Sequence, residues 1–435
     1  MPGVIELIIP NQAEYFLRNP ALHLTGEQRE EVIRFGGTYE CEHSVFWSSN
    51  PRVLLLPAGY DAEWFDDVHA ALGLQPPPVV SPDARSGLLV RDLLQDGAAQ
   101  AVLRKHLSGC VQVDLTMTGP TPDIYLLAAM LRGWGLTVEL DGVTEEHYWS
   151  SLYLDSKVSC LDLARQLPGV LVSDGLIVDN WTELEGAVGV MTARYGRAIV
   201  RSLHGVAGNG TLVVKSGGSL DTVAKDSFFT FPLVVQEFIE HAGDVGCPAV
   251  DVLVGEDGVE DVVLCSLTVE DGHLFRSVNV GQDALPAVWA ERVDQVAHEL
   301  GTAARDLGYR GWMCVDCVAG ADEKLYVTEI NARRSGSTHA GGLLRQWGAE
   351  RDLTLSAHFM VPVPEGTTYR EHIKPVFERL WASGVRAYPT TVRGVGWPDP
   401  IIAVIAAAPT AEEAERIVAG IREAVSPAAA PGKAS

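Results

Sequence analysis

The sequence predicts an α/β protein of mixed α+β character, built from three domains. The chain has 435 residues, which is long for a single hydrophobic core and favours two or three domains. Apolar residues make up 47% of the chain, so a large core can form and extensive disorder is excluded. In the first third, strand-like and helix-like segments alternate, whereas residues 312–330 contain two strands around a short turn. The first pattern indicates a parallel sheet and the second an antiparallel hairpin.

The N-terminal domain is expected to contain a small parallel sheet. Short apolar strands are predicted at residues 53–56, 111–115 and 136–140. Amphipathic segments that predict helices lie at residues 62–72 and 122–132. A strand, a helix and a second strand in this order form a βαβ unit, whose strands are parallel. This pattern extends over about the first 150 residues.

A group of polar side chains is predicted on the hairpin in the second half of the chain. Glu329 and Asn331 point to the same face of their strand, because strand side chains alternate. A carboxylate and an amide oxygen side by side suit Mg²⁺, and a metal ligand is expected to face solvent. Arg333 continues this face with a fixed cation suited to phosphate or carboxylate. The turn at residues 320–323 predicts that Asp316 faces Glu329 across the pair. The alternative is a polar hairpin whose charges are merely solvated.

Asp316, followed by Glu329-Ile330-Asn331-Ala332-Arg333, resembles the metal-binding end of the ATP-grasp superfamily, whose members commonly show an acid and then Glu-x-Asn-x-Arg. The resemblance implies ATP and Mg²⁺ as cofactors, with Asp316, Glu329 and Asn331 as metal ligands. It implies a catalytic role for Arg333, in contact with the transferring phosphoryl group or the tetrahedral intermediate. Arg276 is a second candidate for that role or for binding the substrate carboxylate.

An apolar strand that ends in acids resembles the adenine hinge of the same superfamily. The resemblance implies that Glu237 accepts a hydrogen bond from the adenine amino group and that the backbone of Phe238 and Ile239 reads the ring edge. Glu240 or Asp244 would approach the ribose. The choice between these two acids stays open, because the segment after the strand has looser spacing than is usual in the family.

Two further segments predict phosphate binding. A strand through Arg201 enters a glycine-rich loop that includes Gly208, and glycines let backbone N–H groups turn toward phosphate oxygens. A strand follows this loop where a dinucleotide fingerprint requires a helix, and the loop resembles the ATP-grasp lid over the triphosphate. The family usually has lysine where this chain has Arg201, which keeps the charge and changes the geometry. Lys157 begins a helix capped by Asp155 or Ser156 and matches the family's phosphate-binding lysine.

The resemblance divides the whole chain. It implies a pre-ATP-grasp domain at residues 1–150, a two-lobed ATP-grasp domain at 151–348 with the adenine hinge near 236–240, and a short C-terminal α/β domain at 349–425. The low-complexity composition at the end of the chain predicts a disordered tail at 426–435. The C-terminal domain is expected to contain a strand at residues 401–407 and a helix capped by Thr410.

The layout is most similar to ATP-grasp peptide ligases of the pheganomycin type. This implies an amide bond between an amino acid carboxylate, proteinogenic or not, and a peptide or amino acid amine, through an acyl phosphate that releases ADP and phosphate. Ser335, Ser337 and His339 are candidates for the acceptor pocket, although a lone histidine after a glycine-rich turn is more often structural. The alternatives are a biotin-carboxylase-like carboxylase and a non-catalytic nucleotide-binding regulator. The sequence sets neither the donor acid nor the acceptor.

The net charge and the cysteine content limit which partners and which cellular compartment are expected. The net charge of −24 opposes binding to nucleic acid or to anionic membranes. The first residues lack a basic and an apolar signal region, and the apolar run at 401–408 is too short to span a bilayer. Seven scattered cysteines fit reduced thiols, so a cytoplasmic location is predicted. The oligomeric state is left open, with a homodimer among the alternatives.

Overall fold

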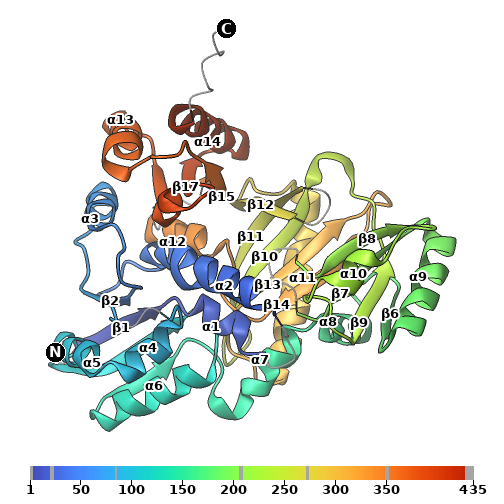
Figure 1. Ribbon diagram of the computed structural model, residues 1–435, viewed down its shortest axis with the longest axis horizontal. Coiled ribbons are helices and arrows are strands. Elements are labelled where there is room, and N and C mark those ends of the chain that lie inside the picture. The colour runs from blue at the N-terminus through green and yellow to red at the C-terminus, as the bar shows by residue number, and fades with distance from the viewer. Residues whose placement is uncertain are drawn as a thin grey trace, which may run out of the picture.

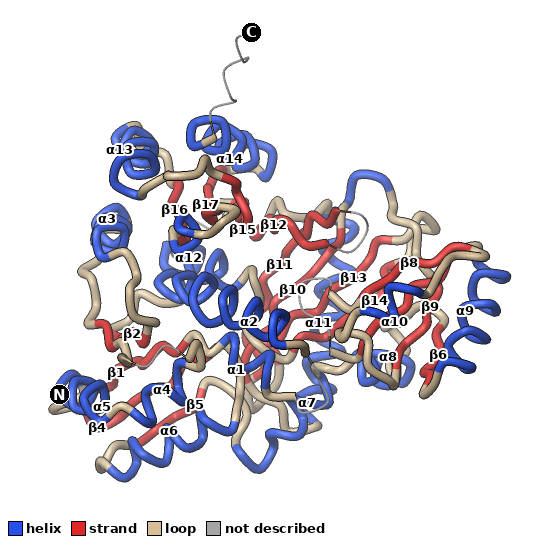
Figure 2. Tube along the Cα trace, in the orientation of Figure 1, coloured by secondary structure: helices blue, strands red, loops and turns tan. Residues whose placement is uncertain are grey.

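The computed structural model describes residues 3–19, 24–83, 86–204, 209–270, 274–347 and 352–426. Within these ranges the strands form a five-stranded, an eight-stranded and a four-stranded sheet. In Figure 1 the five-stranded sheet (blue to cyan) lies on the left and the four-stranded sheet (green) on the right, with the eight-stranded sheet between them. Figure 2 shows that helices border all three sheets. The predicted mixed α/β class is confirmed. The predicted tail lies almost wholly outside the described residues, which end at residue 426.

The five-stranded sheet is parallel throughout, as the βαβ pattern predicts. Its order is β3-β2-β1-β4-β5, with β1 at Gly3–Ile9, β2 at Arg52–Leu55, β3 at Val79–Val80, β4 at Cys110–Met117 and β5 at Thr137–Leu140. The helices α3 (Ala62–Ala71), α4 (Leu89–Gln95), α5 (Gly97–His106) and α6 (Pro122–Gly133) belong to the same part of the chain. The central strand, β1, is absent from the sequence-based prediction, although its apolar run is typical of a buried parallel strand.

A helical segment after β1 leaves this sheet and runs to the middle of the molecule, where α2 lies in Figure 1. It comprises α1 (Gln12–Leu17), α2 (Gly26–Arg34), the π-helix η1 (Phe35–Tyr39) and the 3-10 helix η2 (Glu40–Phe46). Thr25 caps α2 in a reciprocal capping box with Gln28. The Gln28 side chain also donates to Asp226 at 2.9 Å, and the Tyr39 hydroxyl donates to the Phe359 carbonyl at 2.6 Å. The segment therefore joins both lobes of the central region.

The eight-stranded sheet is antiparallel and carries the predicted hairpin. Its order is β14-β13-β10-β11-β12-β15-β17-β16, with β10 at Cys247–Val254, β11 at Val259–Glu270, β12 at Leu274–Gly281, β13 at Gly311–Ala319, β14 at Leu325–Asn331, β15 at Thr354–Pro362, β16 at Ala387–Thr391 and β17 at Ile401–Ala408. The sheet is continuous across the predicted boundary near residue 348. The predicted strand and the Thr410-capped helix near the C-terminus are confirmed as β17 and α14.

Helices cover this sheet. They are α11 (Ala287–Asp306), α12 (Thr338–Trp347), α13 (Lys374–Ala382) and α14 (Ala411–Val425), with the short helices η4 (Gly243–Val245), η5 (Tyr369–Ile373) and η6 (Arg393–Gly396) in its connections. Trp289, Val293 and Leu300 of α11 are buried in one core with Val250 and Val252 of β10. Among the helices of the described ranges, none combines the length and the apolar character needed to cross a bilayer.

The four-stranded sheet forms the second lobe and is also antiparallel. Its order is β6-β9-β7-β8, with β6 at Gly175–Val178, β7 at Arg197–Ser202, β8 at Thr211–Lys215 and β9 at Leu233–Glu237. The helices α9 (Trp181–Tyr195) and α10 (Asp221–Lys225) pack on this sheet. The helices η3 (Glu145–His147), α7 (Tyr148–Leu154) and α8 (Lys157–Gln166) precede it in the chain, and α7 and α8 contribute to the core of the eight-stranded sheet. Leu184, Val188 and Met191 of α9 pack on Val200 and Val235 in a core separate from that of the other sheets. Two antiparallel lobes thus flank the cavity described next.

Candidate active site

A cavity of about 500 Å³ lies where the two antiparallel lobes and the N-terminal helical segment meet. Its floor carries Asp316, Glu329, Asn331 and Arg333, all from β13, β14 and the residues that follow them. Four polar side chains from one hairpin therefore face the same enclosed space. A volume of this size and a mixture of apolar walls with a few polar groups are typical of small-molecule sites.

The β13–β14 hairpin sets the geometry of the floor. Asp316 and Glu329 are direct partners in the ladder, and Cys314 pairs with Asn331, so the predicted hairpin register is confirmed. The Asn331 side chain donates to Asp316 Oδ2 at 2.9 Å, and the Cys314 thiol donates to Asp316 Oδ1 at 3.4 Å. Burial raises the pKa of Asp316 to about 6, and the neighbouring Glu329 carboxylate contributes to this rise. Asp316 and Glu329 therefore lie side by side on a surface of the hairpin that is largely shielded from water.

Two cations neutralise Glu329. The Lys157 ammonium donates to Glu329 Oε1 at 2.6 Å, and the Arg201 guanidinium donates to Glu329 Oε2 at 2.9 Å. The second arm of Arg201 donates to the Thr328 carbonyl at 2.6 Å. The side chains of Lys157 and Glu329 are only 4% and 20% exposed. Burial favours a higher pKa for Glu329, but Lys157 and Arg201 overcome this effect and hold its pKa below the usual value.

The start of α8 places Lys157 at the cavity. Ser156 is the N-cap and accepts from the Ser159 backbone, which settles the choice left open between Asp155 and Ser156. Asp155 instead accepts from the Ala332 backbone N–H at 3.1 Å and pairs with Arg18 at 3.1 Å. Asp155 therefore ties α7, α1 and the end of β14 together. No sequence motif signals this role, because the partners lie far apart in the chain.

Arg333 is held in place by the N-terminal segment. Its guanidinium donates to Asn331 Oδ1 at 3.0 Å and lies 5.2 Å from the centre of the Phe16 ring. Tyr15, on the same helix, donates from its hydroxyl to the Ala332 carbonyl at 3.0 Å. A planar cation fixed by an aromatic ring and an amide keeps its charge in one orientation.

The segment predicted as the adenine hinge lies at the other side of the cavity. Glu237, Phe238 and Ile239 line it at the end of β9, and the Glu237 N–H donates to the Asp174 carbonyl at 2.8 Å. Glu240 is not among the lining residues; its carboxylate pairs with Arg197 and is 62% exposed. Gly208 and the side chain of Asp244 lie outside the described part of the structure.

Arg276 is not brought to the cavity. It is the residue without a ladder partner in a bulge of β12, between the pairs Thr268–Ser277 and Val269–Phe275. Its guanidinium donates to Glu270 at 2.6 Å on the surface, and its side chain is 43% exposed. The bulge accounts for this position, since an extra residue re-aims the side chains around it.

Replacing Arg276 with alanine is therefore expected to change kcat and the KM for ATP by less than about two-fold, because an exposed ion pair contributes little. Steady-state kinetics of the purified variant measure this. A large loss of kcat with an unchanged melting temperature would return Arg276 to the list of catalytic residues.

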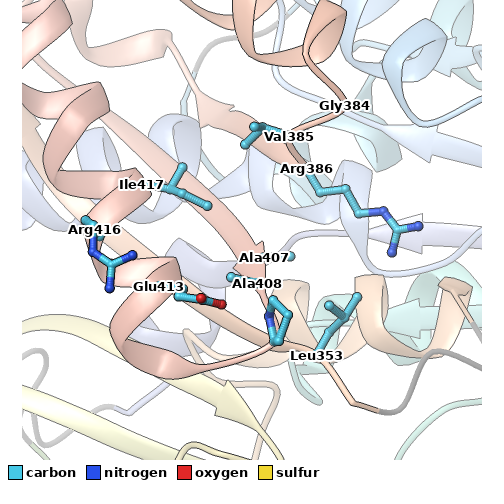
Figure 3. A pocket seen from close by; sticks show the side chains of 10 residues that line it. Leu353, Gly384, Val385, Arg386, Ala407, Ala408, Glu413, Arg416 and Ile417 are labelled. Carbon is cyan, nitrogen blue, oxygen red and sulfur yellow. The ribbon is translucent and has the colours of Figure 1, made fainter.

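A second hollow of about 680 Å³ lies in the C-terminal part, between α14 and the end of β17, and opens widely to solvent (Figure 3). Its lining includes Ala407, Ala408, Glu413 and Ile417. β17 lies near the opposite edge of the eight-stranded sheet from β14. This hollow is therefore separate from the hairpin that carries the floor residues.

The sequence and the structure were compared with those of known proteins. No protein-family model matches the sequence. A curated relative, the L-propargylglycine–L-glutamate ligase of Streptantibioticus cattleyicolor, is 27% identical over 176 residues. The match covers 37% of this chain and 35% of that ligase, so it spans only about a third of the relative's length.

Solved structures match nearly the whole chain. The N5-carboxyaminoimidazole synthase of Aspergillus clavatus, in complex with ADP and 5-aminoimidazole ribonucleotide, has a TM-score of 0.54 at 14% identity and covers 98% of this chain and 99% of that one. The biotin carboxylase of Campylobacter jejuni has a TM-score of 0.54 at 13% identity, covering 97% and 91%. The chain has the ATP-grasp fold. The L-amino acid ligase of Bacillus licheniformis also matches the chain, with a TM-score of 0.52 at 14% identity and 97% coverage of both chains.

The ATP-grasp fold brings most of the predicted site residues to one cavity. They are Lys157, Arg201, Glu237, Phe238, Ile239, Asp316, Glu329, Asn331 and Arg333. Many lining residues from the N-terminal helical segment are absent from the sequence-based prediction, among them Phe16, Glu40 and His43. Their only local signal is aromatic or charged character within a helical stretch, which does not separate a site from an ordinary surface.

Proposed function

We propose that the protein is an ATP-dependent carboxylate–amine ligase that joins an amino acid carboxylate to the amine of a peptide or amino acid. The observation that carries this proposal is the convergence of Asp316, Glu329 and Asn331 with Lys157 and Arg201 on one cavity wall. The amino acid ligases among the matched proteins support it. ATP as a substrate fits a cytoplasmic enzyme.

The floor suits a hard divalent cation such as Mg²⁺. Asp316, Glu329 and Asn331 supply oxygen atoms from two adjacent strands, and Mg²⁺ prefers one or two carboxylates together with substrate phosphates. Burial, together with the neighbouring Glu329 carboxylate, raises the pKa of Asp316, and a bound cation would favour its ionised form. Bound in this place, Mg²⁺ would neutralise charge on the phosphate oxygens.

The proposed reaction has two steps, and the positively charged side chains of the cavity would stabilise the charges that develop in them. A carboxylate oxygen attacks the γ-phosphorus, the bond to ADP breaks, and an acyl phosphate forms. The amine nitrogen then bonds to the acyl carbon, phosphate leaves with the electron pair of the broken C–O bond, and the amine gives up a proton. Lys157 and Arg201 would bind phosphate oxygens of ATP, and Arg333 would stabilise charge on the transferring group. The enclosed cavity would keep water from the acyl phosphate.

Phosphate release from Mg-ATP, with ADP and AMP separated, tests this function. The panel of acids contains amino acids, and each is paired with amino acid and peptide amines while products are screened by mass. ADP together with a new amide is the expected result. AMP and pyrophosphate would contradict the acyl-phosphate mechanism, bicarbonate-dependent turnover with biotin would indicate a carboxylase, and nucleotide binding without turnover would indicate a regulator.

Arg201 offers a graded test of phosphate binding. Its two arms reach the Thr328 carbonyl and the Glu329 carboxylate, and lysine can satisfy only one of these acceptors. Replacement by lysine is expected to raise the KM for ATP about five-fold, and replacement by alanine about 100-fold, since a charged hydrogen bond contributes about 1.5–3 kcal/mol. ATP titrations of both variants measure this. An unchanged KM in the alanine variant would remove Arg201 from the nucleotide site.

A further inference from the structure

Beyond the floor, the cavity has a second wall that contains none of the residues proposed to bind the metal or the phosphates. This wall comes from η1 and η2 on one side, with Tyr39, Glu40 and His43, and from Phe275 and Phe359 of the eight-stranded sheet on the other. The Phe275 and Phe359 rings lie 4.9 Å apart, and the wall includes an acid and an imidazole beside them. It therefore combines apolar surface with few polar groups.

The 3-10 geometry of η2 aims Glu40 and His43 into the cavity together. A 3-10 helix has about three residues per turn, so side chains three positions apart share a face. Glu42 lies on another face, where its carboxylate accepts from the Thr391 hydroxyl at 2.7 Å and from the Val392 N–H at 3.0 Å. Glu42 thus anchors η2 to β16, while Glu40 faces the cavity.

Glu40 meets few partners within the protein. Burial raises its pKa, and the Arg333 charge and the Gln12 side chain oppose this rise. Among the described residues, no lysine, arginine or histidine forms an ion pair with Glu40. A cavity-facing carboxylate with this environment is suited to a cationic group from outside the chain.

Two stacked imidazoles stand beside Glu40. The rings of His43 and His339 are parallel within 15° and 4.7 Å apart, and the Phe359 ring contacts both edge-on at 5.4 and 5.6 Å. Both side chains are buried, and among the described residues neither Nε2 atom has a hydrogen-bond partner. Burial lowers the pKa of His339 to about 4 and that of His43 well below its usual range.

Neutral imidazoles are compatible with a bound cation. His339 also forms a hydrogen bond with the Gly336 backbone, which leaves its Nε2 as an acceptor in the neutral ring. An acid, an accepting imidazole nitrogen and aromatic rings are together the groups that recognise an ammonium ion.

We propose that Glu40, His43 and His339 bind the ammonium group of the amino acid whose carboxylate is activated, and that Phe275 and Phe359 contact its side chain. This rests on the proposed function. Arg333, close enough to Glu40 to act on its charge, would hold the opposite, carboxylate end near the floor. A zwitterionic amino acid matches this arrangement of an acid and a cation along one cavity.

Two measurements on the full chain test the proposal. The first is Mg-ATP-dependent phosphate release with the proteinogenic L-amino acids and with their N-acetyl derivatives, which keep the carboxylate and lose the ammonium charge. The second is calorimetric binding of the same compounds in the presence of Mg-ADP. Wild-type protein is expected to use and bind the free amino acids and to discriminate against the N-acetyl forms by at least about 30-fold.

The E40Q variant is expected to lower kcat/KM for the preferred amino acid about 30-fold with an unchanged KM for ATP, and E40D to have an intermediate effect. Glu30→Gln, on the exposed part of α2 and outside the cavity lining, is the matched control and is expected to behave as wild type.

Several outcomes would overturn the subsite. The first is equal use of free and N-acetyl amino acids by the wild-type protein. The second is an equal loss of kcat/KM for free and N-acetyl amino acids in E40Q. The third is the absence of calorimetric binding of any amino acid. Amino acid binding that needs Glu40, without any phosphate release, would support the subsite and contradict the ligase function. Failure of the two proposals is therefore distinguishable.

Discussion

Replacing Glu329 with glutamine is expected to abolish Mg-ATP-dependent phosphate release and to lower the free energy of unfolding by about 3 kcal/mol. The loss of activity is expected because the proposed function assigns Glu329 as one of the two carboxylate ligands of the metal. The stability falls because the change leaves Lys157 and Arg201, now without their shared acid, in a buried site. The sequence alone predicts a solvent-facing ligand whose loss leaves the fold untouched, and the burial of this carboxylate corrects that expectation.

Denaturant unfolding and phosphate release on the same preparation measure both effects. Glu323→Gln is the matched control, since Glu323 is an exposed acid in the turn of the same hairpin. That variant is expected to keep its activity and its stability. Normal phosphate release in the Glu329 variant would refute the metal assignment, and unchanged stability would refute the account of the ion pairs.

The difference between the sequence-based and the observed site follows from the range of the interactions. The β13–β14 hairpin was predictable, because side-chain alternation and turn residues are local signals. The pairing of Lys157 with Glu329 joins residues 172 positions apart, and only the resemblance to a known family pointed to their proximity. Arg276 lies outside the cavity lining, at a bulge in β12, and such a bulge has no reliable sequence signature.

Sequence patterns could not predict the cavity wall formed by η1 and η2. Its position depends on contacts such as the Tyr39–Phe359 hydrogen bond, which spans 320 residues. Glu40 and His43 share one face of the 3-10 helix η2, and their spacing alone does not predict which way that face points. The fold of each sheet was therefore more accessible from sequence than the far end of the cavity.

Replacing Lys157 with methionine is expected to lower phosphate release about 10³-fold while changing the free energy of unfolding by less than about 1 kcal/mol. Methionine fills a similar volume, and Glu329 keeps Arg201 as its partner at 2.9 Å. On the proposed function, the charge of Lys157 is therefore expected to matter more for the reaction than for the stability of the fold. Lys105→Met, an exposed change on α5, is the control and is expected to leave both quantities unaltered.

The double variant Lys157→Met with Glu329→Gln separates the two contributions. Because it leaves only Arg201 charged in this cluster, it is expected to recover about 1–2 kcal/mol of the stability lost in the single Glu329 variant, within the usual range of coupling between contacting residues. Its phosphate release is expected to stay absent. A strictly additive loss of stability would show that the two side chains do not interact in solution. Restored turnover would show that neither residue acts on ATP, so the cycle tests the ion pair and the nucleotide site independently.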